Sequence, residues 1–442
     1  MVFLLSDIMV FILVLSVIAW FFYAIRKEHW RNAMAHVGRN KLAVFCFGIL
    51  LVYVGIGLLD SVHFKVTQKD GTLGETHSLL DAVSSPLLFD EKEKTYSSPL
   101  ATRSFMKEII AEGGKREHKY PKLYHAGQHL EGRSHMLDIL IRCSIIIALA
   151  VAFFLLLNWF NRFRYKQGGE TVKPLSIYQN VFWVGLFTIF MAILILGSSY
   201  HILGTDKTGN DVFYQAVKSI RVGLIVGTLT TLIVTPLAIM FGTLAGYLGG
   251  WVDDLVQYVY TTLSSIPSIL LIAAAMLIIN ASLHNSKEET LVIADKKLFY
   301  LCVILGITSW TGLCRLVRGE VLKLKNIEYV QAADALGVSR VSVMIRHLVP
   351  NVMHIVLISV ILRFSGLVLF EAVLAYVGIG VDPSLQSWGN MINNARLELA
   401  REPVVWWNLI ASFVFMFGLV LPANIFGDAV RDALDPRLRG EQ

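Results

Sequence analysis

Long apolar runs alternate with polar segments along most of the chain. A membrane-spanning helix needs about 20 mostly apolar residues. Nine segments reach or approach that length: 2–24, 42–60, 138–160, 179–199, 220–246, 257–281, 298–316, 353–379 and 405–427. Helices are the expected spanning form, because lipid offers no partner for free backbone groups and no run shows β-barrel alternation. The pattern predicts an all-α, polytopic membrane protein with about nine spanning helices.

The basic residues of the short polar segments predict the topology. Lys and Arg gather in 25–41, 161–178, 317–352 and the C-terminal tail, which holds Arg437 and Arg439. Alternation of nine helices places all four segments on one side, and short basic loops stay in the cytoplasm. We therefore predict a cytoplasmic C-terminus and an external N-terminus. The first apolar run lacks a positive n-region and a cleavage site, so we expect it to be retained as a helix.

The longest polar segment, 61–137, is external in this topology although it contains eleven Lys and Arg residues. Long loops cross the membrane largely regardless of charge, so the conflict with the topology is weak. The segment shows no clear helical or strand period. It is predicted to be either a small folded insert or a loosely ordered loop.

Composition agrees with a membrane protein. Hydrophobic residues make up 55% of the 442 residues and charged residues 16%, against about 25% charged in globular domains. The net charge of +6 sits in loops between apolar runs, so we interpret it as topology and expect no nucleic-acid partner. The four cysteines have no CxxC spacing and are expected to be buried, unpaired thiols.

Motifs for catalysis are absent from the sequence. We find no GxxxxGK[ST] phosphate loop, no HExxH and no GxSxG, so the chain is not expected to hydrolyse ATP or to act as a metalloprotease or serine hydrolase. His125 and His129 have the i, i+4 spacing of helical metal ligands. Gly127 lies between them and no further ligand set is evident, so we expect a solvated loop and no metal.

Two charged residues fall inside the predicted span 353–379. A charge at the membrane centre costs about 2.5–3.5 kcal/mol on insertion scales. Arg363 and Glu371, about two turns apart, are predicted to line a translocation path or to contact a partner subunit; alternatively they pair locally or reach the headgroups. Asp7 is expected near the outer end of the first helix, within reach of water.

The basic loop 317–352 contains the most informative local pattern. Ala332, Ala333 and Leu336 are spaced to lie on one face of a short helix. Gly337 is expected to end that helix, Ser339 to cap the next one, and Pro350 to begin the following membrane helix. A short helix with small residues can enter a narrow groove on a partner protein.

Several motifs in order resemble one family. The loop 329–351, with its two alanines, Gly337 and a proline thirteen positions later, resembles the EAA loop of ABC importer permeases. The remainder of 200–440 is similar to the second, "C-type" permease of the oligopeptide, dipeptide and nickel group. The similar motifs are His201–Asp206 with Gly209, Asp211 and Arg221; 245–253; Trp310 with 315–322; 378–381 with Pro383; 387–390; and 427–437.

The resemblance implies a function and a set of partners. It implies that 200–442 is a type I ABC importer permease core, placed in the bacterial inner membrane with a sister permease, two cytoplasmic ATPase subunits and an external binding protein. ATP and Mg²⁺ would bind the ATPases, and no cofactor would bind this chain. The implied substrates are peptides, with nickel chelates or another small solute as alternatives. The rival class is a membrane enzyme or scaffold.

The resemblance also implies which residues act. Docking of the ATPase would fall on the loop 317–352, at Tyr329, Gln331, Ala332, Ala333, Asp334, Leu336, Gly337, Arg346, His347 and Pro350. Three positions depart from the family pattern: Gln331 replaces its glutamate, Asp334 stands where a basic residue is frequent, and Asn210 where Arg is frequent.

The first 199 residues depart more. We expect 1–60 to form N-terminal membrane helices with a basic loop, 61–137 an external insert, and 138–199 an additional helix pair. The helix 2–24 and the pair within 138–199 are extra relative to the family. An inserted pair of spans leaves the orientation of the following core unchanged.

Overall fold

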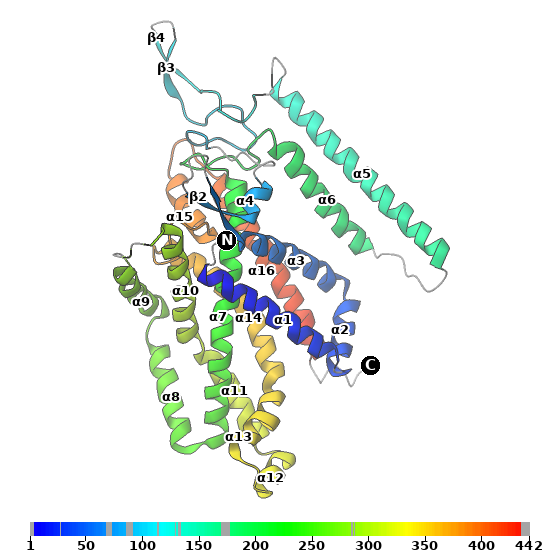
Figure 1. The fold of residues 1–442 in the computed structure, drawn as a ribbon, viewed down its shortest axis with the longest axis vertical. Coiled ribbons are helices and arrows are strands. Elements are labelled where there is room, and N and C mark those ends of the chain that lie inside the picture. The colour runs from blue at the N-terminus through cyan, green and yellow to red at the C-terminus, as the bar shows by residue number, and fades with distance from the viewer. Residues whose placement is uncertain are drawn as a thin grey trace. The chain divides into compact units, whose positions relative to one another are not determined.

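The computed structural model describes residues 4–26, 28–67, 73–84, 92–112, 115–128, 130, 134–168, 177–283, 286 and 288–434 (Figure 1). His129 and the motif end Asp435–Arg437, used above, lie outside these residues. The chain forms two compact units, each assembled from separate stretches. Unit 1 comprises Met1–Val2, Gly48–Ile220 and Gln386–Phe417; unit 2 comprises Phe3–Phe47, Arg221–Leu385 and Gly418–Gln442.

Long apolar helices dominate the part of the chain that the structure describes. Six are long and apolar enough to cross a membrane: α3 (Lys41–Asp60), α5 (His135–Gly168), α6 (Ile177–Gly197), α7 (Val212–Leu248), α14 (Val349–Tyr376) and α16 (Trp407–Leu434). A bent pair, α8 (Gly250–Ser265) with α9 (Ser268–Leu283), adds a seventh if it counts as one span. The all-α membrane architecture is therefore confirmed, and nine spans was an approximation.

Three of the predicted spans differ from the helices observed. The span 257–281 is broken between α8 and α9 by an 86° bend, because Pro267 forces Ile266 into an extended conformation. The span 298–316 is broken at Trp310, where α10 (Thr290–Ser309) meets α11 (Thr311–Leu324). Helix α10 is not among the helices long and apolar enough to cross a membrane. Helix α1 (Leu5–Ile25) is apolar over the shorter stretch Leu5–Ala19.

The described part of 61–137 is a folded insert in unit 1. Strands β1 (His63–Thr67) and β2 (Leu73–Ser78) form one antiparallel hairpin, with a bulge between Lys65 and Thr67. Strands β3 (Glu108–Glu112) and β4 (Lys115–Lys119) form another, with Glu108 opposite Lys119. The short α4 (Leu79–Ser84) follows β2. Each strand has five or six residues, too few for a sequence period to be evident.

The helix pair α5 and α6 of unit 1 packs along its length. In Figure 1, α5 and α6 run side by side. Phe153 stacks on Phe187 with ring centroids 4.2 Å apart. Near the other end of the pair, the Arg142 guanidinium donates to the Ile195 carbonyl and to Asp138. Most of the remaining surface of α5 is apolar and exposed, as expected for a helix that faces lipid.

Unit 2 contains α1, α2 (Glu28–Arg39), most of α7, and the run from α8 to α14. Its largest apolar cluster joins α7, α11 and α14 around Val317, Val321 and Val352. A methyl group at Gly242 or Gly246 would lie within 2.9 Å of α11 backbone oxygens. Helices α7 and α11 therefore approach closely at these glycines, and the packing fixes the loop that follows α11.

Candidate functional site

The loop after α11 folds into short helices whose ends match their sequence signals. Helix α12 (Glu328–Ala335) ends in a Schellman motif: Gly337 donates to the Asp334 carbonyl and Val338 to the Ala333 carbonyl. Gly337 has a φ of +75°, a conformation that favours glycine. The Ser339 hydroxyl accepts from the Ser342 amide and caps α13 (Arg340–Val343). The three predicted signals, Gly337, Ser339 and Pro350 in the first turn of α14, are confirmed.

Helix α12 has one buried and one exposed face. Val330 and Ala333 point into the core of unit 2, whereas Ala332 is exposed and Leu336 is 84% exposed. The expectation that Ala332, Ala333 and Leu336 lie on one face of the helix is therefore wrong for Ala333, which is buried whereas the other two are exposed. Adjacent residues of a helix point about 100° apart, and Ala333 shares the side of Val330, three positions earlier.

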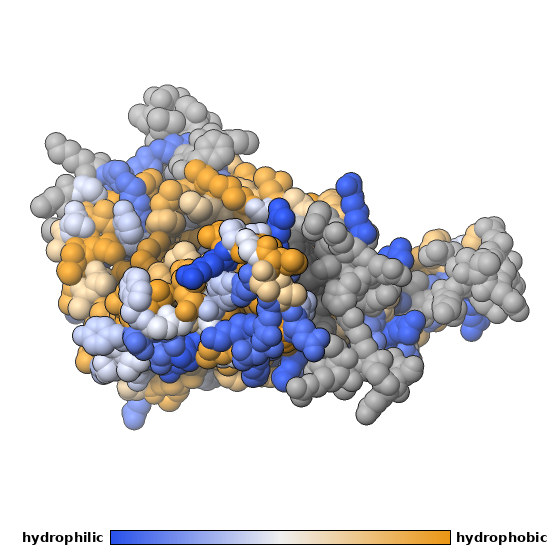
Figure 2. Space-filling model, turned by 90° about the horizontal axis from the view of Figure 1, so that it is seen from below, coloured by the Kyte–Doolittle hydropathy of each residue, from blue (hydrophilic) through white to orange (hydrophobic). Residues whose placement is uncertain are grey.

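Apolar side chains continue the exposed face beyond α12. Ile327, Leu336, Val338, Val341 and Ile345 are all exposed, and Arg340 and Arg346 lie among them. We call these seven residues the α12–α13 surface. Figure 2 views the molecule from the end that carries α12 in Figure 1 and shows hydrophilic and hydrophobic residues intermixed on this face. An apolar surface rimmed by charge is typical of a protein interaction site.

Side-chain hydrogen bonds connect this surface to two long helices. The Tyr247 hydroxyl, at the end of α7, donates to Asp334 at 2.5 Å. The Asn351 amide, at the start of α14, donates to the Tyr329 hydroxyl at 2.8 Å. A π-helical turn, η2 (Met344–Leu348), joins α13 to α14 and carries Arg346 and His347. These contacts link α12 directly to α7 and α14.

The remaining predicted residues of the loop are exposed or half-buried. The Gln331 amide donates to the Asn326 carbonyl at 3.3 Å, and the ring of half-buried His347 lies 6.2 Å from that of Tyr329. Pro350 is exposed.

Arg363 and Glu371 of α14 point into unit 2. The Arg363 guanidinium donates to the Ser309 carbonyl at 2.9 Å, at the C-terminus of α10. A methyl group at Gly312 would lie 2.8 Å from the same guanidinium. Arg363 thus satisfies a helix end where the chain breaks between α10 and α11. Glu371 is buried.

A buried charge cluster joins α1 to α7 and α10 within unit 2. Arg221 donates to Asp7 at 2.7 and 3.0 Å, and lies 3.4 Å from Asp295 of α10. The Ser6 amide donates to Asp295 at 3.0 Å. Asp7 is buried, so the expectation that it reaches water is wrong. The sequence signal was a single charged residue in each of two apolar runs, Asp7 in 2–24 and Arg221 in 220–246. Charges inside a membrane protein usually pair with one another.

The helix α8 displays a polar stripe before the bend. Asp254, Tyr258, Thr261, Thr262 and Ser265 are exposed along it, and with Gln257 they line an open pocket. At the same level Arg315 of α11 donates to the Ser264 hydroxyl at 2.8 Å and lies over the Tyr260 ring. Polar side chains in a membrane span usually face the bundle interior or a water-filled cavity.

A second polar centre lies in unit 1. His201, which is 1% exposed, lies between two carboxylates: Asp211 at 2.7 Å and Glu93 at 3.6 Å. Burial alone would lower the pKa of His201, but the two carboxylates outweigh burial and raise that pKa to about 9. Burial raises the pKa of Glu93, but His201 and two backbone amides outweigh it and lower that pKa to about 2.

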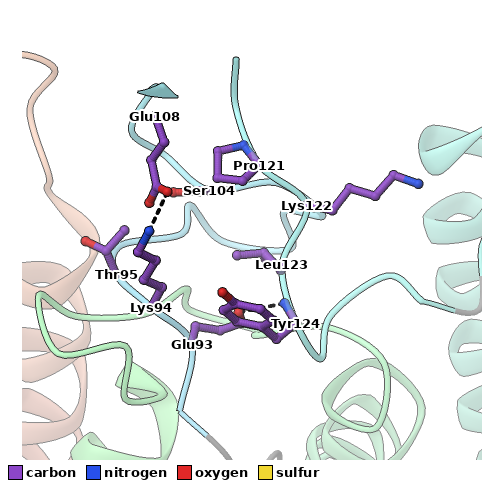
Figure 3. Close-up of a pocket in the computed structure, with 9 residues that line it drawn as sticks. All are labelled: Glu93, Lys94, Thr95, Ser104, Glu108, Pro121, Lys122, Leu123 and Tyr124. Atoms are coloured by element: carbon purple, nitrogen blue, oxygen red, sulfur yellow. Dashed lines mark hydrogen bonds and ion pairs between the residues drawn. The ribbon is translucent and has the colours of Figure 1, made fainter. Parts of the chain in front are cut away.

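Glu93 also organises the insert around it. Its carboxylate accepts from the backbone amides of Tyr124 and His125 at 2.8 and 2.9 Å, and Figure 3 shows Glu93 at the base of the insert beside Tyr124. The Glu93 amide donates to the Gly209 carbonyl, and a Cβ at Gly209 would collide with the Glu93 backbone. We call His201, Glu93 and Asp211 the clamp, because they hold the insert to the segment before α7.

Further contacts extend the clamp within unit 1. The Thr205 hydroxyl donates to the Thr95 carbonyl at 2.9 Å, and the Trp407 indole donates to the Thr205 carbonyl at 3.0 Å. Tyr96 donates to buried Glu398, in α15 (Trp388–Glu398), at 3.3 Å. Among the residues that the structure describes, no group of three His, Cys, Asp or Glu side chains has the arrangement of a metal site.

Comparison with known proteins identifies similar sequences over the later part of the chain. Residues 238–440 match the family model "Binding-protein-dependent transport system inner membrane component". The oligopeptide transport system permease protein OppC of Haemophilus influenzae is 28% identical over 319 residues, covering 70% of this chain and 91% of that protein.

Two further relatives match over 242 residues, or 55% of this chain. The dipeptide transport system permease protein DppC of Bacillus subtilis is 31% identical, and the match covers 70% of that protein. The glutathione transport system permease protein GsiD of Pectobacterium atrosepticum is also 31% identical, with 74% covered. The matched region of the family model contains the α12–α13 surface.

Proposed function

Because the chain belongs to the family of binding-protein-dependent transport system inner membrane components, the permeases of ABC importers, we propose that it carries peptides across the bacterial inner membrane. The substrate class rests on the printed names of its relatives, which transport oligopeptides, a dipeptide and glutathione. As a single permease it would form half of the pathway, with a sister permease as the other half.

The observation that carries the mechanism is the α12–α13 surface. We propose that it docks in a groove of a cytoplasmic ATPase subunit, which holds the ATP and Mg²⁺. Leu336 supports this role, because burying an exposed Leu contributes about 1.5–3 kcal/mol. Arg340 and Arg346 would add charge at the rim, where it favours specificity over affinity. This chain would supply no ATP-hydrolysing residue of its own.

Coupling follows from the contacts of α12. When two ATPase subunits close on ATP, α12 would move with its groove. The hydrogen bonds from Tyr247 and from Asn351 then transmit that motion to α7 and α14. The close packing of α7 on α11 at Gly242 and Gly246 makes these helices move together. The permease would thus alternate between inward and outward access as a two-state element.

The polar stripe of α8 is the proposed pathway surface. Its hydroxyl and amide groups can accept and donate hydrogen bonds to the backbone groups that all peptides share, and Asp254 adds one carboxylate at the start of the stripe. We propose that Arg363 and Glu371 shape this pathway from behind, by holding α10, α11 and α14, since both side chains point into unit 2.

Orientation is part of the same proposal. We propose that the α12–α13 surface and the C-terminus lie in the cytoplasm and the insert outside, and the basic residues of the short loops support this orientation. In a chain whose native cysteines are replaced, a membrane-impermeant maleimide should label Lys122→Cys in intact spheroplasts. Arg340→Cys should react after lysis. Labelling of Arg340→Cys in intact cells would show that the orientation is the opposite of the one proposed.

Transport is tested by reconstituting the complete complex in proteoliposomes. We expect ATP-dependent uptake of a radiolabelled tripeptide, and no ATPase activity from this chain purified alone. Uptake of a nickel chelate without peptide uptake would refute peptides as the substrate class and favour nickel chelates. Hydrolysis by the purified chain, free of ATPase subunits, would overturn the permease mechanism.

A further inference from the structure

Positive charge is concentrated in one part of the insert. Residues 92–124 contain eight Lys and Arg but four Glu, a net charge of +4. One of those glutamates, Glu93, is buried in the clamp and does not contribute to the surface. The exposed basic side chains are Lys92, Lys94, Arg103, Lys107, Arg116, Lys119 and Lys122. We call these seven residues the basic face.

Pairing within the insert balances a minor part of this charge. Lys94 lies 2.5 Å from Glu108 and Lys119 lies 3.0 Å from Glu117. Both pairs are partly exposed, and such pairs contribute roughly 0–1 kcal/mol. Lys122 lines the pocket shown in Figure 3. Arg103 and Lys107 are next in sequence to Ser104 and Glu108, which also line it.

Aromatic side chains accompany the charge. Tyr120, Tyr124 and Ile109 are all exposed, and the Lys107 ammonium lies 5.5 Å from the Tyr120 ring centroid. A pocket of about 40 Å³ opens beside Tyr124, and Lys122 extends away from it (Figure 3). Exposed Tyr and Arg are enriched at protein interfaces and at their energetic hot spots.

The clamp gives this surface a fixed support. Tyr124 is held through its backbone amide by Glu93, and Leu123 donates to the Thr102 carbonyl at 3.1 Å. A single antiparallel β-bridge pairs the backbones of Arg103 and Lys122 and so joins the two segments that carry the charge. A surface that is ordered before binding loses less entropy on binding.

We propose that the basic face docks an acidic surface of the extracytoplasmic substrate-binding protein, an inference that rests on the proposed function. A lipid surface fits less well, because the β3–β4 hairpin projects away from α5 and α6 within unit 1 (Figure 1). The clustered charge would steer the incoming protein and raise the rate of association more than the final affinity. Seven of the eleven basic residues in 61–137, whose external position opposes the usual charge rule, then have a function.

Proximity is tested first with a photo-crosslinker. The variant Tyr120→p-benzoylphenylalanine is expressed in cells together with the whole transport complex and irradiated. We expect the crosslinked protein to be the binding protein whose addition stimulates peptide uptake by the purified complex. Crosslinks to lipid, or to proteins that have no effect on uptake, would contradict the docking role.

The charge is tested by association kinetics of that binding protein with the complex in nanodiscs. The triple variant Arg103→Glu, Lys107→Glu, Lys122→Glu should associate about tenfold or more slowly at 50 mM salt, and the difference should shrink at 500 mM. Replacement of the same lysines by Arg should preserve the wild-type rate. The positional comparison uses two single variants with the same charge change: Lys122→Glu, on the basic face, and Lys207→Glu, on an exposed residue outside it. Only Lys122→Glu should slow association.

The outcomes separate this inference from the proposed function. A wild-type association rate in the triple variant, while the complex still imports peptide, would overturn the basic face as a docking surface and leave the function standing. Failure of the wild-type complex to import any peptide would instead refute the proposed substrate class. If Lys207→Glu slows association as strongly as Lys122→Glu, the effect is one of net charge, and the specific surface is refuted.

Discussion

The two regions for which functions are proposed are stabilised by different interactions. The α12–α13 surface in unit 2 rests on apolar packing around Val330, Val343 and Leu348, with its turns formed by neighbouring residues. The clamp in unit 1 rests on one buried imidazole between two carboxylates. Apolar packing tolerates many substitutions of similar volume, whereas a buried charge tolerates the loss of its partner badly.

This contrast agrees with the functions proposed for the two regions, which are ATPase docking by the α12–α13 surface and support of the basic face by the clamp. A surface that moves with an ATPase needs a firm backing and an exterior that can bind and release, so its affinity should lie in a few exposed apolar side chains. A surface that receives a soluble protein needs a fixed shape on a small insert with little apolar core. Buried ion pairs and hydrogen bonds fix such a shape at the cost of sensitivity to pH.

The largest expected effect is the loss of the clamp carboxylate. Glu93→Ala leaves His201 with a single carboxylate partner, Asp211. It also removes the acceptor of the Tyr124 and His125 backbone amides. Removal of one partner from a buried pair costs about 3–5 kcal/mol, enough to unfold the insert locally. We expect rapid proteolysis within 92–128 in nanodiscs, measured by mass spectrometry. Glu117→Ala, at an exposed pair, is the matched control, and equal protease resistance in both would show that the clamp does not support the insert.

A smaller effect is expected at the α12–α13 surface. Leu336→Asp removes apolar burial worth about 1.5–3 kcal/mol on docking and should lower ATPase co-purification and peptide uptake by about tenfold or more. The protein should accumulate normally, because Leu336 is exposed in this chain. Leu336→Met, which conserves volume, should transport nearly as well as wild type. Unchanged uptake by Leu336→Asp would remove this surface from the coupling mechanism.

The sequence predicted the α12–α13 region better than the clamp for a physical reason. The end of α12, the cap at Ser339 and the start of α14 depend on residues a few positions apart, so local patterns contain the signal. The Thr205–Ser97 contact beside the clamp spans 108 residues, and the Arg221–Asp7 pair spans 214. No local pattern encodes such pairings.

The same distinction explains the individual errors. Pro267 was a visible signal for the bend after α8, but the break at Trp310 depends on Arg363, which lies 54 residues beyond Ser309. The inward position of Ala333 depends on the core that α12 meets. The roles of Gln331, His347 and the other loop residues in docking stay predictions.

A conformational test sharpens the account of α12. Gly337→Ala places a side chain at φ +75° in otherwise open space, so backbone strain is the main cost, roughly 1–2 kcal/mol. We expect uptake to fall several-fold at unchanged expression, with partial recovery in Gly337→Asn, since Asn tolerates this conformation. Gly319→Ala, inside α11 with open space around it, should be neutral. Wild-type uptake by Gly337→Ala would mean that the geometry of this turn is not needed.

The smallest expected effect is a dependence of the clamp on pH. The pKa of His201 is raised to about 9 in the folded protein, so the stability that it contributes is complete below its unfolded pKa of about 6.5 and disappears as the pH rises through about 9. The pKa of Glu93 is lowered to about 2, so its contribution is lost only in acid, below about 4.3. Between pH 7 and pH 8 the insert should therefore lose about 1 kcal/mol of local stability.

This loss is measurable by hydrogen exchange. The exchange-protected amides of Tyr124 and His125, which Glu93 holds, should show a decrease in protection between pH 7 and pH 8 after correction for the intrinsic rate. The amides of α12 serve as the internal control, because that helix rests on apolar packing around Val330 and Ala333. The variant His201→Gln should remove the pH dependence while retaining a neutral hydrogen-bonding side chain. An equal change in both regions would show that the clamp carries no titrating charge, and the contrast between the two regions would then fail on its electrostatic side.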